Sequence, residues 1–477
     1  MESVTLAATQ AVHAVHAASA EHAAAAAHAA PAARAVHALQ TAAAAPRIDT
    51  GDTAWLLAAT ALVLLMTPGL ALFYGGMVRT KSVLNMLMMS FVSIALVTVV
   101  WLACGYSLAF GGDTAAGLIG GLHEAGLTGI GPASVHGTVP TLLFATFQLT
   151  FAIITAALIS GAIADRAKFA AWLVFVPLWA LVVYVPVAHW VWGPGGWIGH
   201  GLGALDFAGG LPVEITSGAS GLALCLVLGP RLGFKKDAMR PHNLPMVMLG
   251  AGLLWFGWFG FNAGSAMGAT GLAAAAFLNT LAAGCTGLLG WLFVEHKRDG
   301  HPTTLGAASG AVAGLVAVTP SCGTVSLLGA LVVGLAAGVV CSYAVGWKFR
   351  LNYDDSLDVV GVHLVGGVIG TVLIGLFAER AMTGGPEGLL YGGGLAPLGR
   401  QLLAVAAVGA YAFAVTYGLG RLLDRTMGLR AGEEQEHTGL DLTVHAETAY
   451  DHGVLGHGAP VGASPALSSV QKAKTQA

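Results

Sequence analysis

Long apolar runs separated by short polar connectors make up most of this chain. Eleven such runs lie between residues 52 and 423, and ten of them have at least 22 residues. An α-helix needs about 20 residues to cross a bilayer, so each of these runs predicts a transmembrane helix. The runs are 52–77, 84–110, 139–163, 169–193, 209–230, 243–264, 270–294, 303–319, 324–347, 356–378 and 398–423. We therefore expect an all-α polytopic membrane protein with eleven transmembrane helices.

Composition supports this fold class. Of 477 residues, 56% are hydrophobic and 9% are charged, and the mean hydropathy is +0.75. A soluble domain carries roughly 25% charged residues. The net charge of -3 provides no basic surface for nucleic acid, which excludes that class of partner. The five cysteines stand at unrelated spacings, which predicts small buried side chains rather than a disulfide framework or a metal site.

Glycine is the second feature of the composition, with 68 residues. Small residues let transmembrane helices approach closely. Glycines four residues apart therefore predict helix contact faces. They occur at Gly306, Gly310 and Gly314, at Gly334 and Gly338, and at Gly366 and Gly370.

The basic residues predict the orientation of the chain. Connectors after odd-numbered runs, together with the C-terminal segment, contain 17 of the 21 Lys and Arg residues. Cytoplasmic loops are enriched in these residues, so we expect the N-terminus outside and the C-terminus inside. The regular alternation also suggests inverted five-helix repeats plus an eleventh helix. One short similarity between the two halves supports these repeats. Asp206 precedes Glu214 at the start of the fifth run, and Asp358 precedes His363 at the start of the tenth.

Glu214 and His363 are titratable residues within apolar runs. Such residues are costly in a membrane unless they face a partner or a wet cavity, so they are candidate functional sites. Only 16 residues, Ile215 to Pro230, follow Glu214 in its run, about 24 Å of helix. This length places Glu214 in the outer half of the membrane, whereas His363 lies near the midplane. The two would meet only if the fifth helix is offset or tilted, and they would then titrate as a unit and could pass a proton.

Aromatic residues form a second candidate feature. Phe147 and Phe151 share a face of the third run, Phe261 lies near Ser265 in the sixth, and Trp192 ends the fourth. Aromatic residues at this spacing are typical of core packing, and a terminal Trp is typical of the interfacial belt. Around an outer vestibule, the same rings would attract a small cation, and the serine hydroxyl could accept its hydrogen bond.

Six segments, in order along the chain, closely resemble the ammonium transporter (Amt/Mep/Rh) family, and the bacterial Amt branch in particular. They are TPGLALFYGGMVR, ALDFAGG, RPHNLPM, GWFGFNAGS, DVVGVH and GLRAGEEQEHTGLD. The resemblance extends from about residue 52 to 450.

The resemblance implies a homotrimer in the cytoplasmic membrane, with a narrow pore for ammonium or ammonia in each subunit and no cofactor or bound metal. It assigns Trp192, Phe147 and Ser265 to an outer recruiting site and Phe151 and Phe261 to a stacked gate. Structural acids would be Asp206 and Asp358. His363 would be one of two pore histidines, and the position of the other is taken by Glu214. Because of this departure, the resemblance does not fix the pH dependence, the rate or the ion selectivity of transport.

The regions outside the apolar runs differ in character. Residues 1–50 form an Ala/His-rich low-complexity extension before the membrane domain at 51–425. Residues 426–450 resemble the regulatory C-terminal region of the family, which would dock on the cytoplasmic face and contact a PII-type signalling protein. Residues 451–477 are rich in Gly, Ala, Ser and Pro, which predicts a disordered tail.

Three other functions compete with transport of ammonium as interpretations of the sequence. The chain could be an ammonium sensor that signals through its tail and a PII-type protein. An unrelated proton-coupled transporter could use the same acid–histidine pair, although the ordered family segments disfavour it. An enzyme is the least favoured, because the sequence shows no nucleophile–base set and no metal-ligand cluster.

Overall fold

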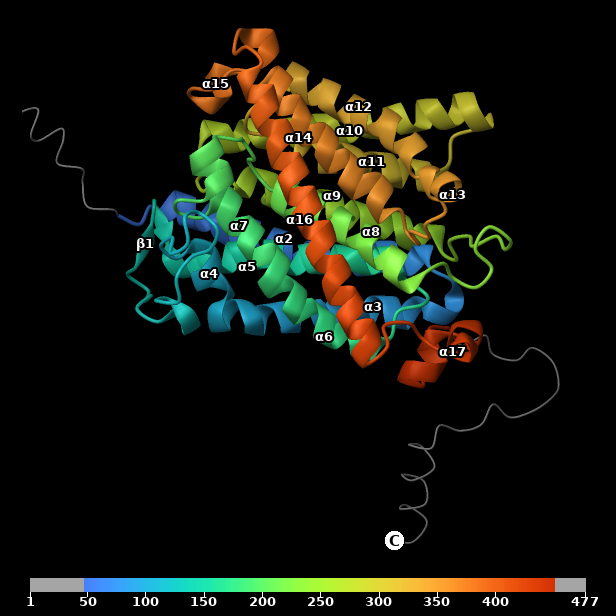
Figure 1. Cartoon of the computed structure of the whole chain (residues 1–477). Coiled ribbons are helices and arrows are strands. Elements are labelled where there is room, and N and C mark those ends of the chain that lie inside the picture. Colours follow the sequence, from blue (N-terminus) through green and yellow to red (C-terminus); the bar gives the residue numbers. More distant parts are fainter. Residues whose placement is uncertain (1–46, 451–477) are drawn as a thin grey trace, which may run out of the picture.

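The computed structural model describes residues 47–450, so most of the predicted N-terminal extension and all of the predicted tail at 451–477 lie outside the described residues. The described chain is a helical bundle (Figure 1). The main helices are α2 (Thr50–Met77), α3 (Val83–Val100), α4 (Tyr106–Phe110), α5 (Thr141–Ile159), α6 (Phe169–Trp179), α7 (Val185–Trp192), α8 (Thr216–Leu228), α9 (Leu244–Gly264), α10 (Gly271–Asp299), α11 (Thr304–Val318), α12 (Leu327–Ala344), α14 (Val365–Phe377) and α16 (Ala396–Thr426).

The shorter elements lie in the connections and in the C-terminal segment. They are the helices α13 (Trp347–Leu351), α15 (Arg380–Thr383) and α17 (Glu433–Thr438) and the antiparallel strands β1 (Val135–His136) and β2 (Val139–Pro140). Several long helices contain π-helical turns, which continue α3 into α4, α6 into α7, and lead into α8 and α14. Such turns occur often at functional sites.

The predicted apolar runs correspond to the observed helices. Within residues 47–450, ten helical segments are long and apolar enough to cross a membrane. The predicted run at 303–319 forms α11, which is apolar but has only 15 residues. Many large apolar side chains on the outer faces of these helices are exposed, as a protein surrounded by lipid requires.

The predicted glycine faces are confirmed as close contacts between helices. A Cβ atom at Gly338 of α12 would stand 2.1 Å from the carbonyl oxygen of Gly287 on α10. At Gly370 of α14, it would stand 1.8 Å from the carbonyl oxygen of Ala317. No side chain fits at either position, so glycine sets the distance between these helices.

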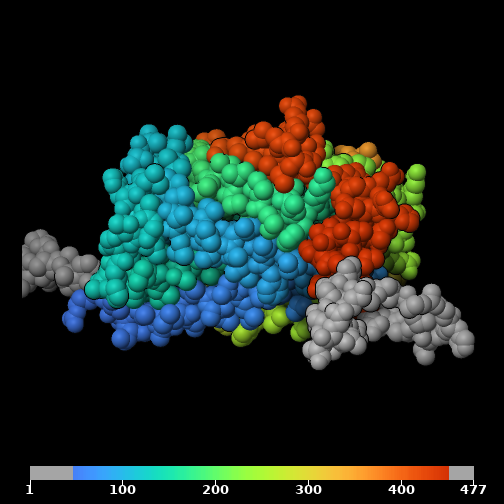
Figure 2. Space-filling view, turned by 90° about the horizontal axis from the view of Figure 1, so that it is seen from below, coloured from blue at the N-terminus to red at the C-terminus, as the bar shows by residue number. Residues whose placement is uncertain are grey.

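The two ends of the bundle differ. The loops between α4 and α5, with β1 and β2, gather at one end, and α17 and the C-terminal segment lie at the other (Figure 1). In Figure 2 the red C-terminal residues cover the end opposite to the teal loop residues. α16 crosses one side of the bundle and packs against α8 and α14.

Candidate functional site

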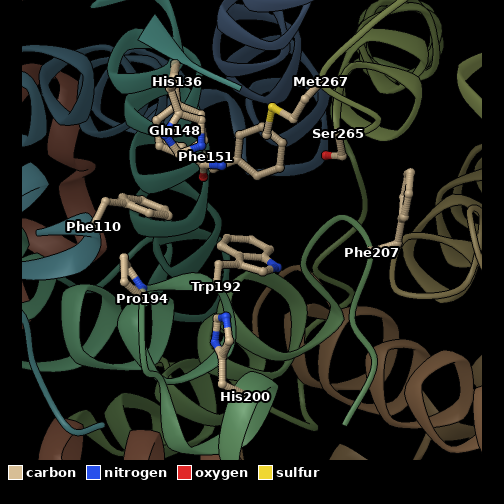
Figure 3. Close-up of a pocket in the computed structure, with 11 residues that line it drawn as sticks. Phe110, His136, Gln148, Phe151, Trp192, Pro194, His200, Phe207, Ser265 and Met267 are labelled. Atoms are coloured by element: carbon tan, nitrogen blue, oxygen red, sulfur yellow. The ribbon is translucent and has the colours of Figure 1, made fainter. Parts of the chain in front are cut away.

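A cavity of about 360 Å³, here named the wide cavity, is lined in part by Phe110 of α4 and His136 of β1 (Figure 3). Its walls are largely aromatic, and within residues 47–450 they contain no carboxylate. The lining residues are Phe110, His136, Phe144, Gln148, Phe151, Trp192, Pro194, His200, Phe207, Ser265 and Met267. Aromatic faces attract cations through their quadrupole, so the cavity suits a small cation.

Two of the predicted recruiting residues, Trp192 and Ser265, line this cavity in fixed orientations. Trp192 Nε1 donates a hydrogen bond to the carbonyl oxygen of Asp206 at 3.0 Å. Ser265 Oγ donates to the carbonyl oxygen of Phe261 at 2.9 Å. Because the serine proton is engaged there, the oxygen keeps its lone pairs for a donor in the cavity.

Phe147, the third predicted recruiting residue, is not on the cavity wall. Its side chain is fully buried, and its ring makes an edge contact with Phe151 at a centroid distance of 4.9 Å. On α5 the cavity face is formed by Phe144, Gln148 and Phe151, one helical turn apart from each other. Phe147 therefore packs against Phe151 behind the cavity wall, and its assignment to the recruiting site stays a prediction.

Phe151 and Phe261 form a stack, as the predicted gate requires. Their ring centroids are 4.1 Å apart and their planes differ by 23°. Phe151 lines the wide cavity, whereas Phe261 lines a second, narrow cavity of about 10 Å³. The stacked rings thus separate two cavities.

The narrow cavity is apolar except for the predicted pore pair. Its lining residues are Met66, Leu70, Phe73, Ile154, Leu158, Val213, Glu214, Leu254, Trp258, Phe261, Val312 and His363. His363 Nδ1 lies 2.7 Å from Glu214 Oε2, and both side chains are buried. A volume of this size is about that of one water-sized molecule. Beyond the stacked rings, a small molecule therefore meets a hydrogen-bonded acid–imidazole pair.

The structure brings Glu214 and His363 together because the helix of Glu214 begins inside the protein. Glu214 lies in a π-helical turn, Gly210–Ile215, that leads into α8. The Asp206 carboxylate accepts hydrogen bonds from the backbone N–H groups of Gly209, Gly210 and Leu211 at 2.6–2.9 Å. Burial raises the pKa of Asp206 to about 6, and these donors counter the shift. This buried helix start agrees with the condition set in the sequence analysis, that the two residues meet only if the fifth helix is offset or tilted.

His363 stands on a second helix start of the same construction. It lies in the π-helical turn Val360–Leu364, which leads into α14. Here the Asp355 carboxylate accepts from the backbone N–H groups of Val359 and Val360 at 3.1 and 2.7 Å. Burial raises the pKa of Asp355 to about 6, against the charge of Lys348.

The counterpart of Asp206 is therefore Asp355, which corrects the sequence comparison that paired Asp206 with Asp358. Asp358 instead accepts from Lys348 Nζ at 2.6 Å, and its carboxylate is 26% exposed. A signal for Asp355 was present in the spacing: Asp206 precedes Glu214 by eight residues, and Asp355 precedes His363 by eight.

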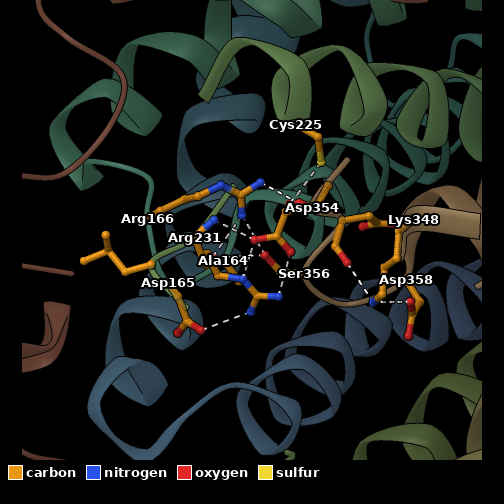
Figure 4. A network of polar contacts seen from close by, with 12 residues as sticks. Ala164, Asp165, Arg166, Cys225, Arg231, Lys348, Asp354, Ser356 and Asp358 are labelled. Atoms are coloured by element: carbon orange, nitrogen blue, oxygen red, sulfur yellow. Dashed lines mark hydrogen bonds and ion pairs between the residues drawn. The ribbon is translucent and has the colours of Figure 1, made fainter. Parts of the chain in front are cut away.

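A buried network of ion pairs, shown in Figure 4, includes Asp354, the residue directly before Asp355. Arg231 binds both oxygens of Asp354 at 2.9 Å and reaches Asp165 at 3.2 Å. Burial disfavours the charge of Asp354, but its bonds with Arg231 hold its pKa below the ordinary value. Arg166, fully buried, donates to Ser356 Oγ and to the carbonyl oxygen of Asp354. The network ties the connection before α14 to those after α5 and α8.

The C-terminal segment docks against this end of the bundle. Glu436 of α17 accepts from the backbone N–H of Leu232 at 2.6 Å and from Arg430 at 2.8 Å. Asp441 accepts from the backbone N–H groups of Leu84 and Asn85 at the start of α3. These contacts hold the C-terminal segment against the bundle. That this end is the cytoplasmic face stays a prediction.

Comparisons with known proteins agree with this architecture. The family model for the Ammonium Transporter Family matches residues 54–450. The ammonium transporter of Mycobacterium tuberculosis is 55% identical over 435 residues, which cover 85% of this chain and 91% of the relative. The crystal structure of Saccharomyces cerevisiae Mep2 matches with a TM-score of 0.76 and 37% identity, covering 81% of this chain and 88% of Mep2.

A further structural neighbour carries the name Sensor Amt Protein. It matches with a TM-score of 0.77 and 28% identity, covering 82% of this chain and 97% of its own. The family match over most of the sequence and the extensive identity to a named transporter confirm the resemblance carried by the six sequence segments. The chain belongs to the ammonium transporter family.

Proposed function

We propose that this protein transports ammonium across the cytoplasmic membrane through a pore in each subunit. The single observation that carries the proposal is the order of its parts: a wide aromatic cavity, the Phe151–Phe261 stack, and a narrow cavity that holds Glu214 and His363. In this order, the wide cavity attracts a cation, the Phe151–Phe261 stack blocks the entry of its hydration shell, and the narrow cavity admits a smaller molecule.

The chemistry of each part supports a division of labour. The cation is recruited against Trp192 and Phe151 with a hydrogen bond to Ser265. At the Phe151–Phe261 stack, which itself offers no acceptor for an ion, one N–H bond of the cation breaks. The Glu214–His363 pair accepts the proton, and the neutral molecule enters the narrow cavity. Potassium has no proton to lose, so deprotonation discriminates against it.

The Glu214–His363 pair is the proposed route of the proton. A carboxylate and an imidazole joined by a 2.7 Å hydrogen bond share one proton easily, because each accepts it in turn. A Glu–His pair also differs in charge from two imidazoles, since loss of its shared proton leaves a net negative charge. We propose that the pair relays the proton, so that transport carries current.

The remaining features of the proposal concern assembly and orientation. The wide cavity faces outward, and the docked C-terminal segment lies in the cytoplasm, as the distribution of Lys and Arg predicts. All eleven apolar helices, α11 included, form the membrane domain at residues 51–425, in a homotrimer. Relatives named as transporters support a role in transport rather than in enzymatic catalysis.

The test is ammonium-evoked current in proteoliposomes on a supported membrane. The native protein is compared with Glu214→Ala, Glu214→Gln and Glu214→His at several pH values. We expect current with ammonium but not with potassium, and a loss of at least about tenfold in the Ala and Gln variants. Glu214→His is the matched control, because it restores a titratable partner for His363.

Two results would contradict the proposal in different ways. Native current that persists in Glu214→Ala would reject the relay but leave transport standing. Absence of both ammonium current and ammonium-driven internal pH change in the native protein would reject transport itself.

A second candidate function is that of an ammonium sensor. The neighbour named Sensor Amt Protein and the docked C-terminal segment favour it. In this case, ammonium in the wide cavity would alter the affinity of a PII-type protein for the cytoplasmic face. Ammonium-dependent binding of such a protein, in the absence of flux, would support it.

A further inference from the structure

One buried histidine contacts the backbone beside two residues of the wide cavity wall, Phe110 and Trp192 (Figure 3). His189 lies on α7, three residues before Trp192, and its side chain is fully buried. Its Nδ1 atom is 2.9 Å from the carbonyl oxygen of Ala109, the residue before Phe110. A Cβ atom at Gly193 would collide with Nδ1, so the ring packs directly against the backbone that follows Trp192.

The other ring nitrogen of His189 faces an acidic side chain. Nε2 makes no hydrogen bond within residues 47–450, and Oδ1 of Asp113 lies 3.5 Å from it. Asp113 stands in the loop after α4, and its carboxylate accepts hydrogen bonds from the backbone N–H groups of Ala115 and Gly117 at 3.1 and 2.9 Å. These bonds hold the pKa of Asp113 below its ordinary value. The side chain that faces Nε2 is therefore an anion.

Neither neutral form of the imidazole satisfies both neighbours. A neutral ring has one N–H group and one acceptor nitrogen, whereas the Ala109 carbonyl and the Asp113 carboxylate can only accept. With the proton on Nδ1, the lone pair of Nε2 faces a carboxylate. With the proton on Nε2, the lone pair of Nδ1 faces a carbonyl oxygen. Only the imidazolium, which has a proton on both nitrogens, presents a donor to each neighbour.

No second titratable side chain bonds to His189. The elements packed against α7 carry four such side chains, and none forms a hydrogen bond or ion pair with the ring in the described part of the chain. They are Tyr106 on α4, Tyr184 in the π-helical turn Ala180–Tyr184, His200 in the π-helical turn Trp197–Leu202 and Glu214 in the turn before α8. Asp113 is therefore the counter-charge of the imidazolium.

We propose that His189 is an imidazolium that positions the wall of the wide cavity. Its Nδ1 atom donates to Ala109, and its Nε2 atom forms an ion pair with Asp113. These two contacts tie α7 to the end of α4 and to the loop that follows it, and so fix Phe110 and Trp192 in the wall. The effect on transport rests on the proposed function, because it assumes that the cation enters through this cavity.

The first measurement is the protonation of His189 itself. Full-length protein with nitrogen-15-labelled histidine is studied in liposomes by solid-state NMR near neutral pH. The His189 signals are those absent from His189→Gln, and His189→Asn is a second variant for the same assignment. We expect both ring nitrogens to carry a proton. In Asp113→Asn, one of them should lose it, because the amide removes the counter-charge.

The second measurement separates positioning from folding. Initial ammonium flux in proteoliposomes gives a half-saturating concentration and a maximal rate. We expect Asp113→Asn to raise the half-saturating concentration about threefold and to keep the maximal rate within about twofold, because the wall changes while the narrow cavity does not. Asp299→Asn is the matched control, since it breaks an ion pair with Arg298 in which the side chains are 41% and 42% exposed.

The outcomes separate this inference from the proposed function. An unprotonated ring nitrogen on His189 in the native protein would overturn the inference. It would also fail if Asp113→Asn kept both protons on His189, or lowered the melting temperature and the maximal rate with an unchanged half-saturating concentration, as a purely structural role requires. If the native protein shows no ammonium flux, the proposed function fails, and the NMR spectrum still decides whether His189 is an imidazolium.

Discussion

Glu214 and His363 stand on two helix starts that share a backbone plan but differ in their surroundings. Each start has an aspartate eight residues before the titratable side chain, a π-helical turn, and a helix of 13 residues. In each, the aspartate accepts backbone N–H groups that the helix itself leaves unpaired. The repeated plan supports the inverted repeats expected from the sequence.

The surroundings of the two starts are opposite in charge content. The first adjoins the wide cavity, where Trp192 Nε1 donates a hydrogen bond to the backbone of Asp206; the described part of its lining is largely aromatic and contains no carboxylate, Lys or Arg. The second adjoins the buried ion pairs of Arg231, Asp354, Asp165 and Lys348, beneath the docked C-terminal segment. The same backbone plan therefore adjoins an aromatic cavity at one end and a buried ion-pair network at the other.

The largest expected effect tests the anchoring role. Asp354→Ala leaves Arg231 buried without its bidentate partner, which should lower the free energy of unfolding by about 3–5 kcal/mol. The matched control is Glu387→Ala, which breaks the ion pair with Arg380, whose side chain is 69% exposed; this change should cost about 0–1 kcal/mol. Denaturant titration in mild detergent measures both. Equal losses in the two variants would remove the anchoring role of the buried network.

The next effect tests whether the two helix starts are equivalent. Asp206→Ala and Asp355→Ala each leave buried backbone N–H groups unpaired, at about 1–3 kcal/mol per variant. We expect similar losses of stability. Only Asp206→Ala should also weaken ammonium binding, because Asp206 positions the loop that holds Trp192.

Denaturant titration and the ammonium-dependent shift in melting temperature separate these two effects. The Asn variants at both positions are the controls, because they keep one acceptor oxygen. Weakened ammonium binding of the same size in Asp355→Ala would show that the cavity does not depend on the first start in particular.

Much of the fold was predictable from the apolar runs, since each long run formed a helix close to its predicted bounds. The glycine spacings also predicted real helix contacts. The contact between Glu214 and His363 was not predictable by counting residues. The helix of Glu214 begins within the protein, where Asp206 replaces the water that would otherwise bind the free N–H groups.

The site was predictable in part. Trp192, Ser265 and the Phe151–Phe261 stack occupy the expected places around the cavities, although their roles remain proposals. Phe147 is buried against Phe151, and the spacing of the two residues alone does not tell which ring reaches the cavity. Gln148, which lines the wide cavity, was missed because a single polar residue in an apolar run gives no sign of the cavity beside it.

The smallest expected effect concerns the docked C-terminal segment, which contacts Leu232 beside Arg231 of the buried network. Glu436 is 1% exposed and holds both Leu232 N–H and Arg430. Glu436→Gln keeps one acceptor oxygen but loses the charge, and Arg430 is partly exposed, so the segment should loosen by only about 1 kcal/mol. That corresponds to roughly fivefold faster cleavage of residues 427–450 by a protease that cuts the open form.

Glu433→Gln, at an exposed position of the same helix, is the control. If Glu436→Gln lowered the stability of the whole bundle as far as Asp354→Ala does, the segment would be part of the anchoring core. Selective cleavage with an unchanged bundle would instead make it a separable cover, free to respond to a partner.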